Sequence, residues 1–398
     1  MEPETQSGLP EATPTDNAAQ VDVFTGEATD GLIPGAALVP ASDTHKGARW
    51  IFMGTQGLRA GWSALLFLLL AFLLLVPLGF LGNLIAHDVL HVQKGIFTPF
   101  EAILQELVSV LAVLGAGVLV ALIERRRLLD YYLTGPRRSR DFSAGLVAGF
   151  AGLSVLVAAL ALGGWLHFGP VALTGAQIFS NAALWGVCFL LVGFFEEGTF
   201  RCYLQFTLTR GINFWWALGI EAIICLDLLL RSKGNGVWGV YAVALLGLVP
   251  CLLLQLRKVD GAGFWQAAWV TSTVFGFIHT GNNGENWIGI FAAAAIGFVF
   301  CVSIWVTGSA WWAIGCHAGW DWAETYFYGT ADSGMQAQGH YLTASPAGPA
   351  LWSGGTDGPE GSLLVLGAIL LLLVTLLLIY GRKRETVQAV AAIEQLPA

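Results

Sequence analysis

Two adjacent glutamates in an apolar stretch are the first residues of this sequence whose types and spacing could do chemistry. Glu196 and Glu197 follow two phenylalanines, and Arg201 stands four residues after Glu197. Residues four apart share one face of a helix and can pair, whereas Glu196 points about 100° away from Glu197. One carboxylate therefore has a cationic neighbour and the other has none, which can give them different roles as acid and base. A buried ion pair that only fixes helix packing is the alternative interpretation.

Two histidines occupy further apolar stretches. His279 stands four residues after Phe275, and His317 stands four residues before Asp321, so a helix would bring each pair onto one face. Asp321 could orient the imidazole of His317 or exchange a proton at a reaction centre. Glu324, one helical turn beyond Asp321, is a candidate supporting residue or marks the outer end of the helix. A single histidine in an apolar helix is often a packing residue, so each motif alone also allows a structural interpretation.

The composition indicates that these ionisable residues lie in membrane-spanning segments. Of the 398 residues, 56% are hydrophobic and 12% are charged. Soluble domains carry about 25% charged residues. The apolar runs 62–80 and 363–379 are long enough for spans, since about 20 helical residues cross a bilayer. An ionisable side chain in hydrocarbon costs on the order of 2.5–3.5 kcal/mol, so such residues are functional candidates.

The hydropathy pattern predicts an all-α fold, a polytopic transmembrane helical bundle with about ten spans. All six cysteines fall in these spans without a CxxC pair, which argues against a disulfide framework and a thiolate zinc site. The loop at 330–361 is expected to be a disordered connection or a lid. The ten spans are expected near residues 61–84, 102–123, 143–166, 180–210, 213–230, 236–256, 263–280, 287–307, 309–328 and 362–380.

The chain ends differ in composition from the predicted bundle at 47–385. Residues 1–46 are predicted to be a disordered acidic tail, because eight acids and no Lys or Arg occur in residues 1–44. This tail has no basic segment followed by an apolar one, so no cleaved signal peptide is expected. Residues 386–398 are a short C-terminal tail. The formal net charge of −8 thus arises in the N-terminal tail, and no basic stripe suggests a nucleic-acid partner.

Basic clusters beside the spans favour an orientation with both termini in the cytoplasm. Three clusters then fall on the cytoplasmic side, whereas Arg231 and Lys233 do not. This layout predicts a multi-pass protein of a bacterial inner membrane, surrounded by the lipid bilayer. The clusters consist of Arg125, Arg126, Arg127, Arg137, Arg138 and Arg140, then Arg257 and Lys258, and finally Arg382, Lys383 and Arg384.

The spans can bring the motifs together if residues 213–256 are an inserted helical hairpin. The helices that carry Glu197 and His279 would then be neighbours. At about 1.5 Å per residue, the two side chains would lie roughly 21 and 25 Å from the same membrane side. By the same rule His317 is only about 12 Å from its own turn, so its span must begin deeper or tilt.

At these residues the chain resembles the CAAX-protease and bacteriocin-processing (CPBP, or ABI) family of intramembrane peptidases. The family pattern is a Glu-Glu-x-x-x-Arg motif, a Phe-x-x-x-His motif and a His-x-x-x-Asn/Asp motif, each on its own transmembrane helix. Residues 196–201, 275–279 and 317–321 match these motifs in order. The departure is the long connection between the first two motifs. Glu221 and Asp227 lie in that connection and are expected to be packing residues.

The resemblance implies a glutamate peptidase for a membrane-embedded or membrane-associated peptide substrate, with no cofactor or metal. Glu196, assisted by His279, would activate the water, and Glu197 would support the site, held by Arg201. Phe275 belongs to the second motif as a supporting residue.

The third motif is implied to stabilise the tetrahedral oxyanion through His317 and Asp321. A carboxylate cannot donate a hydrogen bond, so Asp321 is expected mainly to orient His317.

Two alternatives use the same residues differently. Two histidines with two or three carboxylates are plausible ligands of a catalytic zinc, although no HExxH pair is present. A non-catalytic membrane protein could also keep such a polar network, as a bacteriocin immunity or sorting factor, a scaffold or a transporter. The substrate itself is not predicted beyond a membrane-associated peptide or protein.

Overall fold

The computed structural model describes residues 49–54, 57–89, 98–231, 237–259, 261–282 and 284–381. The predicted tails at 1–46 and 386–398 lie outside these residues, as do Lys233 and the last basic cluster at 382–384.

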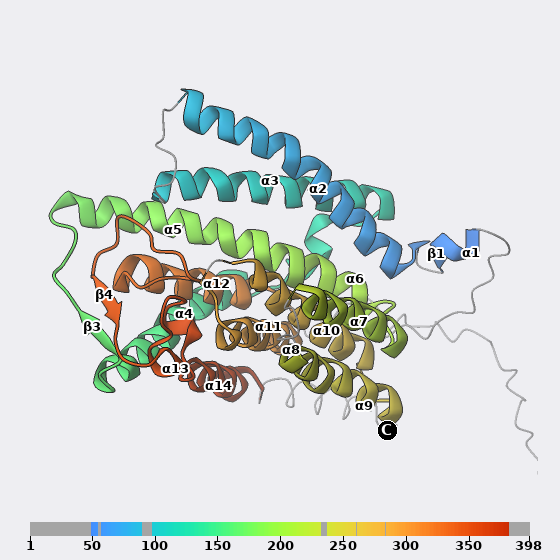
Figure 1. Ribbon diagram of the computed structural model, residues 1–398. Helices are drawn as coiled ribbons and strands as arrows, with labels where there is room; N and C mark the ends of the chain where they lie inside the picture. Colours follow the sequence, from blue (N-terminus) through green and yellow to red (C-terminus); the bar gives the residue numbers. More distant parts are fainter. Residues whose placement is uncertain are drawn as a thin grey trace, which may run out of the picture. The chain divides into compact units, whose positions relative to one another are not determined.

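Helices make up most of the described chain (Figure 1). The longer ones are α2 (Ala60–Leu84), α3 (Pro99–Glu124), α4 (Arg138–Leu162), α5 (Ala176–Glu197), α7 (Phe214–Arg231), α9 (Val249–Arg257), α10 (Ala262–Ile278), α11 (Trp287–Thr307), α12 (Trp311–Asp321) and α14 (Val365–Leu376). Shorter α-helices are α1 (Arg49–Phe52), α6 (Gln205–Thr209), α8 (Val237–Ala242) and α13 (Ala350–Ser353). Segments of π-helix are η1 (Ile85–Val89), η3 (Gly198–Leu204), η4 (Val243–Leu248), η6 (Trp322–Tyr328) and η8 (Leu377–Gly381), and 3₁₀ turns are η2 (Leu128–Asp130), η5 (His279–Gly281) and η7 (Pro359–Gly361).

Two short antiparallel strand pairs accompany the helices. Strand β1 (Met53–Gly54) pairs with β2 (Gly57–Leu58). Strand β3 (Leu166–Phe168) pairs with β4 (Ala344–Pro346), which joins the segment after α4 to the long loop before α14.

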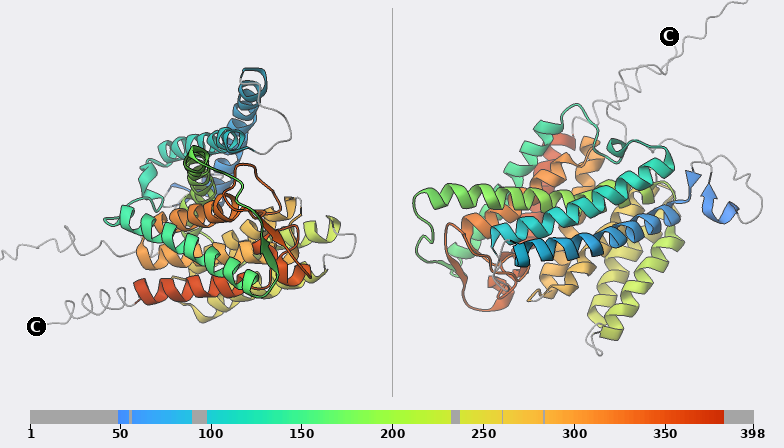
Figure 2. Two further views of the ribbon diagram at one scale, coloured as in Figure 1. Left: turned by 90° about the vertical axis from the view of Figure 1, so that its left-hand side faces the viewer. Right: turned by 90° about the horizontal axis from the view of Figure 1, so that it is seen from above.

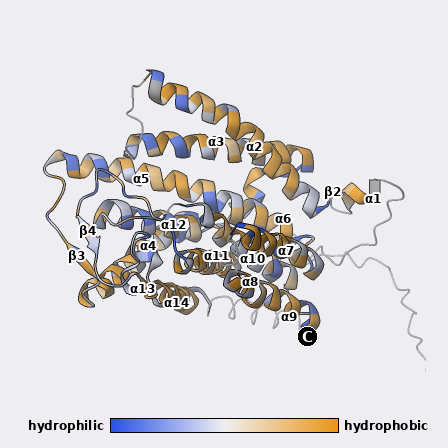
Figure 3. Ribbon diagram, viewed as in Figure 1, coloured by the Kyte–Doolittle hydropathy of each residue, from blue (hydrophilic) through white to orange (hydrophobic). Residues whose placement is uncertain are grey.

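The predicted polytopic helical bundle is confirmed. Each of the ten predicted spans contains a helix, and six helices in the described residues are long and apolar enough to cross a membrane. Apolar residues run along α2 and α14 (Figure 3). On α2, Phe72 and Phe80 are 62% and 72% exposed, as expected for side chains that face lipid. Ten as the number of spans stays a prediction. The six helices are α2, α3, α4, the continuous helix Ala176–Thr209, Val237–Arg257 and α11.

Helices α2, α3 and α5 form a row in which α3 contacts both of the others (Figure 2). Helix α3 begins where Thr98 caps it: the hydroxyl of Thr98 accepts a hydrogen bond from the backbone N–H of Glu101. It ends at Arg125, whose left-handed conformation stops the helix. The row brings the start of α3 alongside α5.

Glycines allow α4 and α12 to pack with their backbones in contact, and this is the most extensive helix pair. A Cβ atom at Gly149 would lie 2.0 Å from the carbonyl oxygen of Cys316. Cβ atoms at Gly145, Gly315 and Gly319 would lie 2.1–2.2 Å from backbone carbonyl oxygens of the facing helix. Small residues four apart permit such close approach in membranes. The pair therefore fixes α12, which carries the third motif, against α4.

The helices that carry the first two motifs are neighbours, as the sequence predicts. Both η3 and α6 contact α10, and α7 and α9 pack on α10 from the segment 213–256. Glu221 is a buried residue of α7. A Cβ atom at Gly247, on η4, would lie 2.6 Å from Oε1 of Glu221. Asp227 forms an ion pair with Arg231 at 2.8 Å. Neither acid lines the cavity onto which the three motifs converge.

The loop at 330–361 is ordered and packs over the end of α12. The backbone N–H of Tyr341 donates to the carbonyl of Tyr326 at 2.7 Å. Asn286 caps α11 and also binds the loop, because its backbone N–H donates to Oδ2 of Asp357 and its amide donates to the carbonyl of Gly361. Of the two expectations for this loop, a disordered connection is therefore wrong.

Candidate active site

The first motif lies where α5 passes into π-helix η3. Glu196 and Glu197 end α5, and Arg201 lies within η3. Such π-helical turns often mark functional sites. The side chains of Glu197 and Arg201 are fully buried, and Nε of Arg201 lies 3.2 Å from Oε2 of Glu197. The predicted pair is present, and it is out of reach of solvent.

Three aromatic rings also contact the guanidinium of Arg201. Its central carbon lies 4.2 Å from the ring centre of Phe275, and the rings of Phe200 and Phe300 lie 5.7 and 5.6 Å away. A Cβ at Gly297 would lie 2.1 Å from Nη2, so only glycine leaves room for this guanidinium. Cation–π contacts of this kind contribute more when they are desolvated. The second motif therefore contacts the first through the ring of Phe275.

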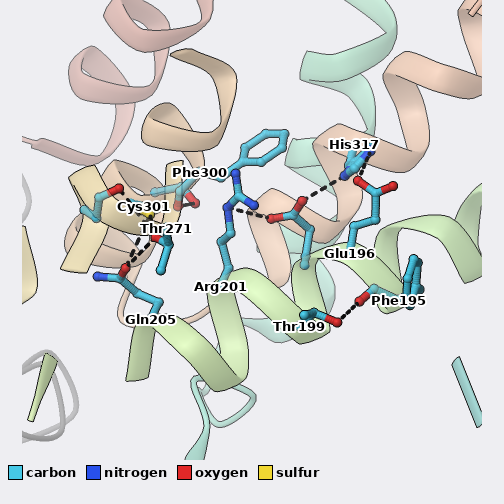
Figure 4. Close-up of polar contacts among 12 residues, drawn as sticks. Phe195, Glu196, Thr199, Arg201, Gln205, Thr271, Phe300, Cys301 and His317 are labelled. Atoms are coloured by element: carbon cyan, nitrogen blue, oxygen red, sulfur yellow. Dashed lines mark hydrogen bonds and ion pairs between the residues drawn. The ribbon is translucent and has the colours of Figure 1, made fainter. Parts of the chain in front are cut away.

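Glu197 also contacts His317, which joins the first motif to the third. Figure 4 shows Glu196 and Arg201 of the first motif on one helix, with His317 of the third motif beside Glu196. Nδ1 of His317 lies 2.8 Å from Oε1 of Glu197. Nε2 of the same ring lies 3.4 Å from Oδ2 of Asp321 and 3.7 Å from Oε2 of Glu196. Ionised carboxylates only accept hydrogen bonds, so a proton on each ring nitrogen satisfies these contacts.

The second motif fixes the tautomer of His279. Its Nδ1 lies 2.8 Å from the backbone carbonyl oxygen of Phe275. A carbonyl can only accept, so Nδ1 carries the proton and donates it. In the neutral ring Nε2 is then the unprotonated nitrogen, which can accept a proton.

The three motifs converge on one cavity of about 220 Å³. Five predicted site residues line it, namely Glu196, Phe275, His279, His317 and Asp321. Glu197 does not, and the exposures of the two glutamates agree: the side chain of Glu196 is 23% exposed and that of Glu197 is not exposed. The two adjacent carboxylates therefore have different surroundings, as the sequence predicts.

Glu196 and His279 line the same cavity without a direct hydrogen bond in the described residues. Among the described residues, Glu196 instead forms an ion pair with His317, at 3.7 Å from its Nε2. His317 contacts Glu197 directly, although its distance from its own turn is shorter. This contact is consistent with the expectation that its span begins deeper or tilts.

In the described chain no hydrogen bond or ion pair joins Glu324 to His317 or Asp321. Its Oε2 accepts a hydrogen bond from the indole N–H of Trp320 at 3.0 Å, and it lies beside Asp332 and Glu360. The two latter residues line the cavity from the 330–361 loop. Burial raises the pKa of Asp332, and burial together with neighbouring acids raises the pKa of Glu360 well above its ordinary value.

Sequence reasoning missed Glu106, whose side chain lines the cavity from α3. As an acid inside a predicted span, it carried the same signal as the residues that were found. The spacing of Gly145 and Gly149, and of Gly315 and Gly319, was a second visible signal. Asp332 and Glu360 had no signal, because acids in a loop are ordinary.

A comparison with known families agrees with this geometry. The sequence model of the Rce1-like family, described as type II CAAX prenyl endopeptidase, matches residues 251–323. This match supports the resemblance to the CPBP family. The matched stretch contains the second and third motifs, whereas Glu196 and Glu197 precede it.

Neither a curated protein nor a solved structure matches the chain. Together, the family match and the apolar helices support a multi-pass membrane protein that is similar to CAAX proteases.

Proposed function

We propose that this CPBP protein is an intramembrane endopeptidase that hydrolyses a peptide bond with water activated by Glu196. The observation that carries the proposal is the different placement of the two motif carboxylates. Glu196 faces the cavity, whereas Glu197 is buried between Arg201 and His317. A general base must reach the proton that it takes, either directly or through one water. Glu196 meets that requirement, and Glu197 does not.

The proposed first step is proton transfer from a water in the cavity to Glu196. His279 assists, because its unprotonated Nε2 can accept a hydrogen bond from the same water. The water oxygen attacks the carbonyl carbon of the substrate and forms a tetrahedral oxyanion. When the C–N bond breaks, the proton held by Glu196 passes to the leaving nitrogen, and the carboxylate is restored.

His317 is proposed to donate a hydrogen bond to the oxyanion through Nε2–H. Its Nδ1 is engaged with Glu197, which fixes the ring, and Arg201 in turn fixes Glu197. Preorganised donors of this kind typically contribute about 10²–10³-fold in rate. Asp321, 3.4 Å from Nε2, is proposed to orient the ring rather than to donate. Glu197 and Arg201 are thus positioning residues.

The proposed substrate is a peptide segment of a membrane-associated protein. The catalytic side chains lie on helices in an apolar, multi-pass bundle, so a substrate held at the bilayer has the shortest path to the cavity. A location in a bacterial inner membrane, with cytoplasmic termini, is part of the same proposal.

Cleavage of a quenched fluorescent peptide library by the full chain in nanodiscs tests the proposal. Glu196→Gln should lower the rate by about 10²–10⁴-fold, because an amide cannot act as the base. Glu221→Gln is the matched control, since it changes a buried acid on α7 outside the cavity and should retain the rate. Equal cleavage by wild type and Glu196→Gln would contradict the proposal.

A zinc-selective chelator, used with Ca²⁺ in excess, separates this mechanism from a zinc-dependent one. In the described residues the two histidines and Glu196 do not form a group with metal-ligand spacing. The proposal therefore predicts full activity with the chelator present. Loss of activity that added Zn²⁺ restores would favour the metal mechanism.

A further inference from the structure

Three carboxylates lie close together beside the cavity. They are found near the C-terminal end of the helix that α12 and η6 form, whereas His317 lies in α12. Glu324 belongs to η6, Asp332 to the loop that follows and Glu360 to η7, and one oxygen of each lies within 4.8 Å of the others. In the described chain no Lys or Arg forms an ion pair with any of the three. The hydroxyl of Thr325 donates to Oδ2 of Asp332 at 2.8 Å and orients that carboxylate.

Glu324 has a carboxylate oxygen that nothing in the described chain satisfies. The residue is fully buried, and its Oε1 has no hydrogen-bond partner there. Its Oε2 shares the indole N–H of Trp320 with Oε1 of Glu360, at 3.0 and 2.8 Å. One donor thus serves two carboxylates. A buried polar atom without a partner costs about 1–3 kcal/mol, and more if it is charged.

A fourth acid increases the negative charge of this region. Asp357 is 1% exposed, its Oδ2 accepts from the backbone N–H of Asn286, and its Oδ1 has no partner among the described residues. Burial and the nearby Asp332 raise the pKa of Asp357 to about 6. Buried charges in proteins are normally paired or bind metal ions.

We propose that Glu324, Asp332 and Glu360 bind a hard divalent cation, Ca²⁺ or Mg²⁺, that fastens the 330–361 loop to η6 beside the cavity. Carboxylate oxygens are the ligands that these ions prefer. Oxygens on opposite sides of a Ca²⁺ ion are about 4.6–5.2 Å apart, and those around Mg²⁺ are at most about 4.2 Å apart. The three oxygens lie within 4.8 Å of one another, a spacing compatible with binding to one Ca²⁺ ion. Mg²⁺ requires a tighter arrangement of the same oxygens or a bridging water.

This site is separate from the residues proposed to act on the substrate, and it does not depend on peptidase activity. The cation occupies the position of the missing partner of Glu324 and cancels the repulsion between acids from three chain segments. Asp332 and Glu360 also line the cavity, so the bound cation holds two of the cavity's lining residues in place.

Equilibrium dialysis of the chelator-stripped full chain in detergent, with Ca²⁺ and Mg²⁺ in separate arms, tests the site. Wild type should bind one ion per chain. Glu324→Gln should weaken binding by at least about tenfold, since even outer partners of metal ligands contribute 10–100-fold. Glu221→Gln, a buried acid on α7 outside the group, should bind as wild type does.

Thermal unfolding of the same protein provides a second test, which uses the variant Glu360→Gln in place of Glu324→Gln. The cation should raise the unfolding midpoint of wild type and leave that of Glu360→Gln unchanged. Without cation, Glu360→Gln should unfold at a higher temperature than wild type, because it removes one repelling charge. Equal binding by wild type and Glu324→Gln, or no binding by wild type, would overturn the proposal and would leave a shared proton as the partner of Glu324.

Discussion

Two groups of buried carboxylates lie along the helix formed by α12 and η6, and they differ in how their charge is compensated. Near His317, the carboxylates of Glu197 and Asp321 contact an imidazole, and Glu197 also contacts the guanidinium of Arg201. One turn further along, Glu324 lies beside two other acids, without a cationic partner in the described chain.

The difference concerns the source of the compensating positive charge: the chain itself at His317, and the surroundings at Glu324. The group at His317 contains its own positive charges, so its properties should respond to substitutions. The group at Glu324 has no such charge in the described chain, so its properties should respond to cations in solution. Substitutions and changes of solution, each with a control elsewhere in the chain, can therefore test both sides of this comparison.

The largest effect on stability should follow from removal of Arg201. Arg201→Ala leaves Glu197 buried without its cation, which typically costs about 3–5 kcal/mol. Arg231→Ala is the matched control, because it breaks a pair of the same spacing with Asp227 whose arginine side chain is 67% exposed. Exposed pairs contribute about 0–1 kcal/mol. Thermal unfolding in detergent compares the two, and similar losses would contradict the account of the buried pair.

Packing of α4 on α12 should be the next most sensitive feature. Gly149→Ala places a Cβ against the carbonyl oxygen of Cys316, and overpacking typically costs about 1–3 kcal/mol. A Cβ atom at Gly367 on α14 would have no other atom within 4 Å. Gly367→Ala should therefore be neutral or slightly stabilising. The unfolding midpoints measure both changes. A stable Gly149→Ala variant that keeps its activity would show that close packing does not position His317.

A smaller loss should follow from replacement of the ring beside Arg201. Phe275→Leu keeps an apolar side chain but removes the cation–π contact, which contributes about 0.5–2 kcal/mol. Combined with Arg201→Ala, the two losses should be less than additive. Strictly additive losses in this double-mutant cycle would show that Phe275 does not hold Arg201.

The smallest effect should be a dependence of stability on pH in cation-free buffer. Burial and the nearby Asp357 raise the pKa of Glu285 from 4.5 to about 8. Between these values the folded chain binds more protons than the unfolded chain, so stability falls as the pH rises from about 4.5 to about 8. The unfolding midpoint should therefore be lower at pH 8.5 than at pH 5, by a smaller margin in Glu285→Gln. A midpoint that rises over this window would contradict the assignment.

The sequence predicts the helical bundle, and it also marks the residues of the three motifs as candidates for the site. Charged side chains are costly inside a membrane, so those at Glu196, Glu197 and Asp321 stand out from the apolar spans that carry them. The pairing of Glu197 with Arg201 follows from helix geometry alone. The contact between Glu197 and His317 joins residues 120 apart and depends on the depth at which α12 begins. Sequence spacing does not determine that depth.

The acidic group at Glu324 could not be predicted for a different reason. Asp332 and Glu360 reach it from a loop whose path depends on packing against η6 and α11 rather than on hydropathy. The π-helical turns η3 and η6 are likewise set by tertiary contacts. These are the places where local sequence preference and global structure differ.

The most direct test of the central claim is a parallel measurement of hydrolysis rate and unfolding midpoint for Glu196→Gln and Glu197→Gln. The account predicts that Glu196→Gln lowers the rate by about 10²–10⁴-fold at an unchanged midpoint, because Glu196 acts on water in the cavity. Glu197→Gln should lower both the rate and the midpoint, since it breaks the buried contacts to Arg201 and His317. A Glu196→Gln variant that cleaves within about tenfold of wild type would contradict the account.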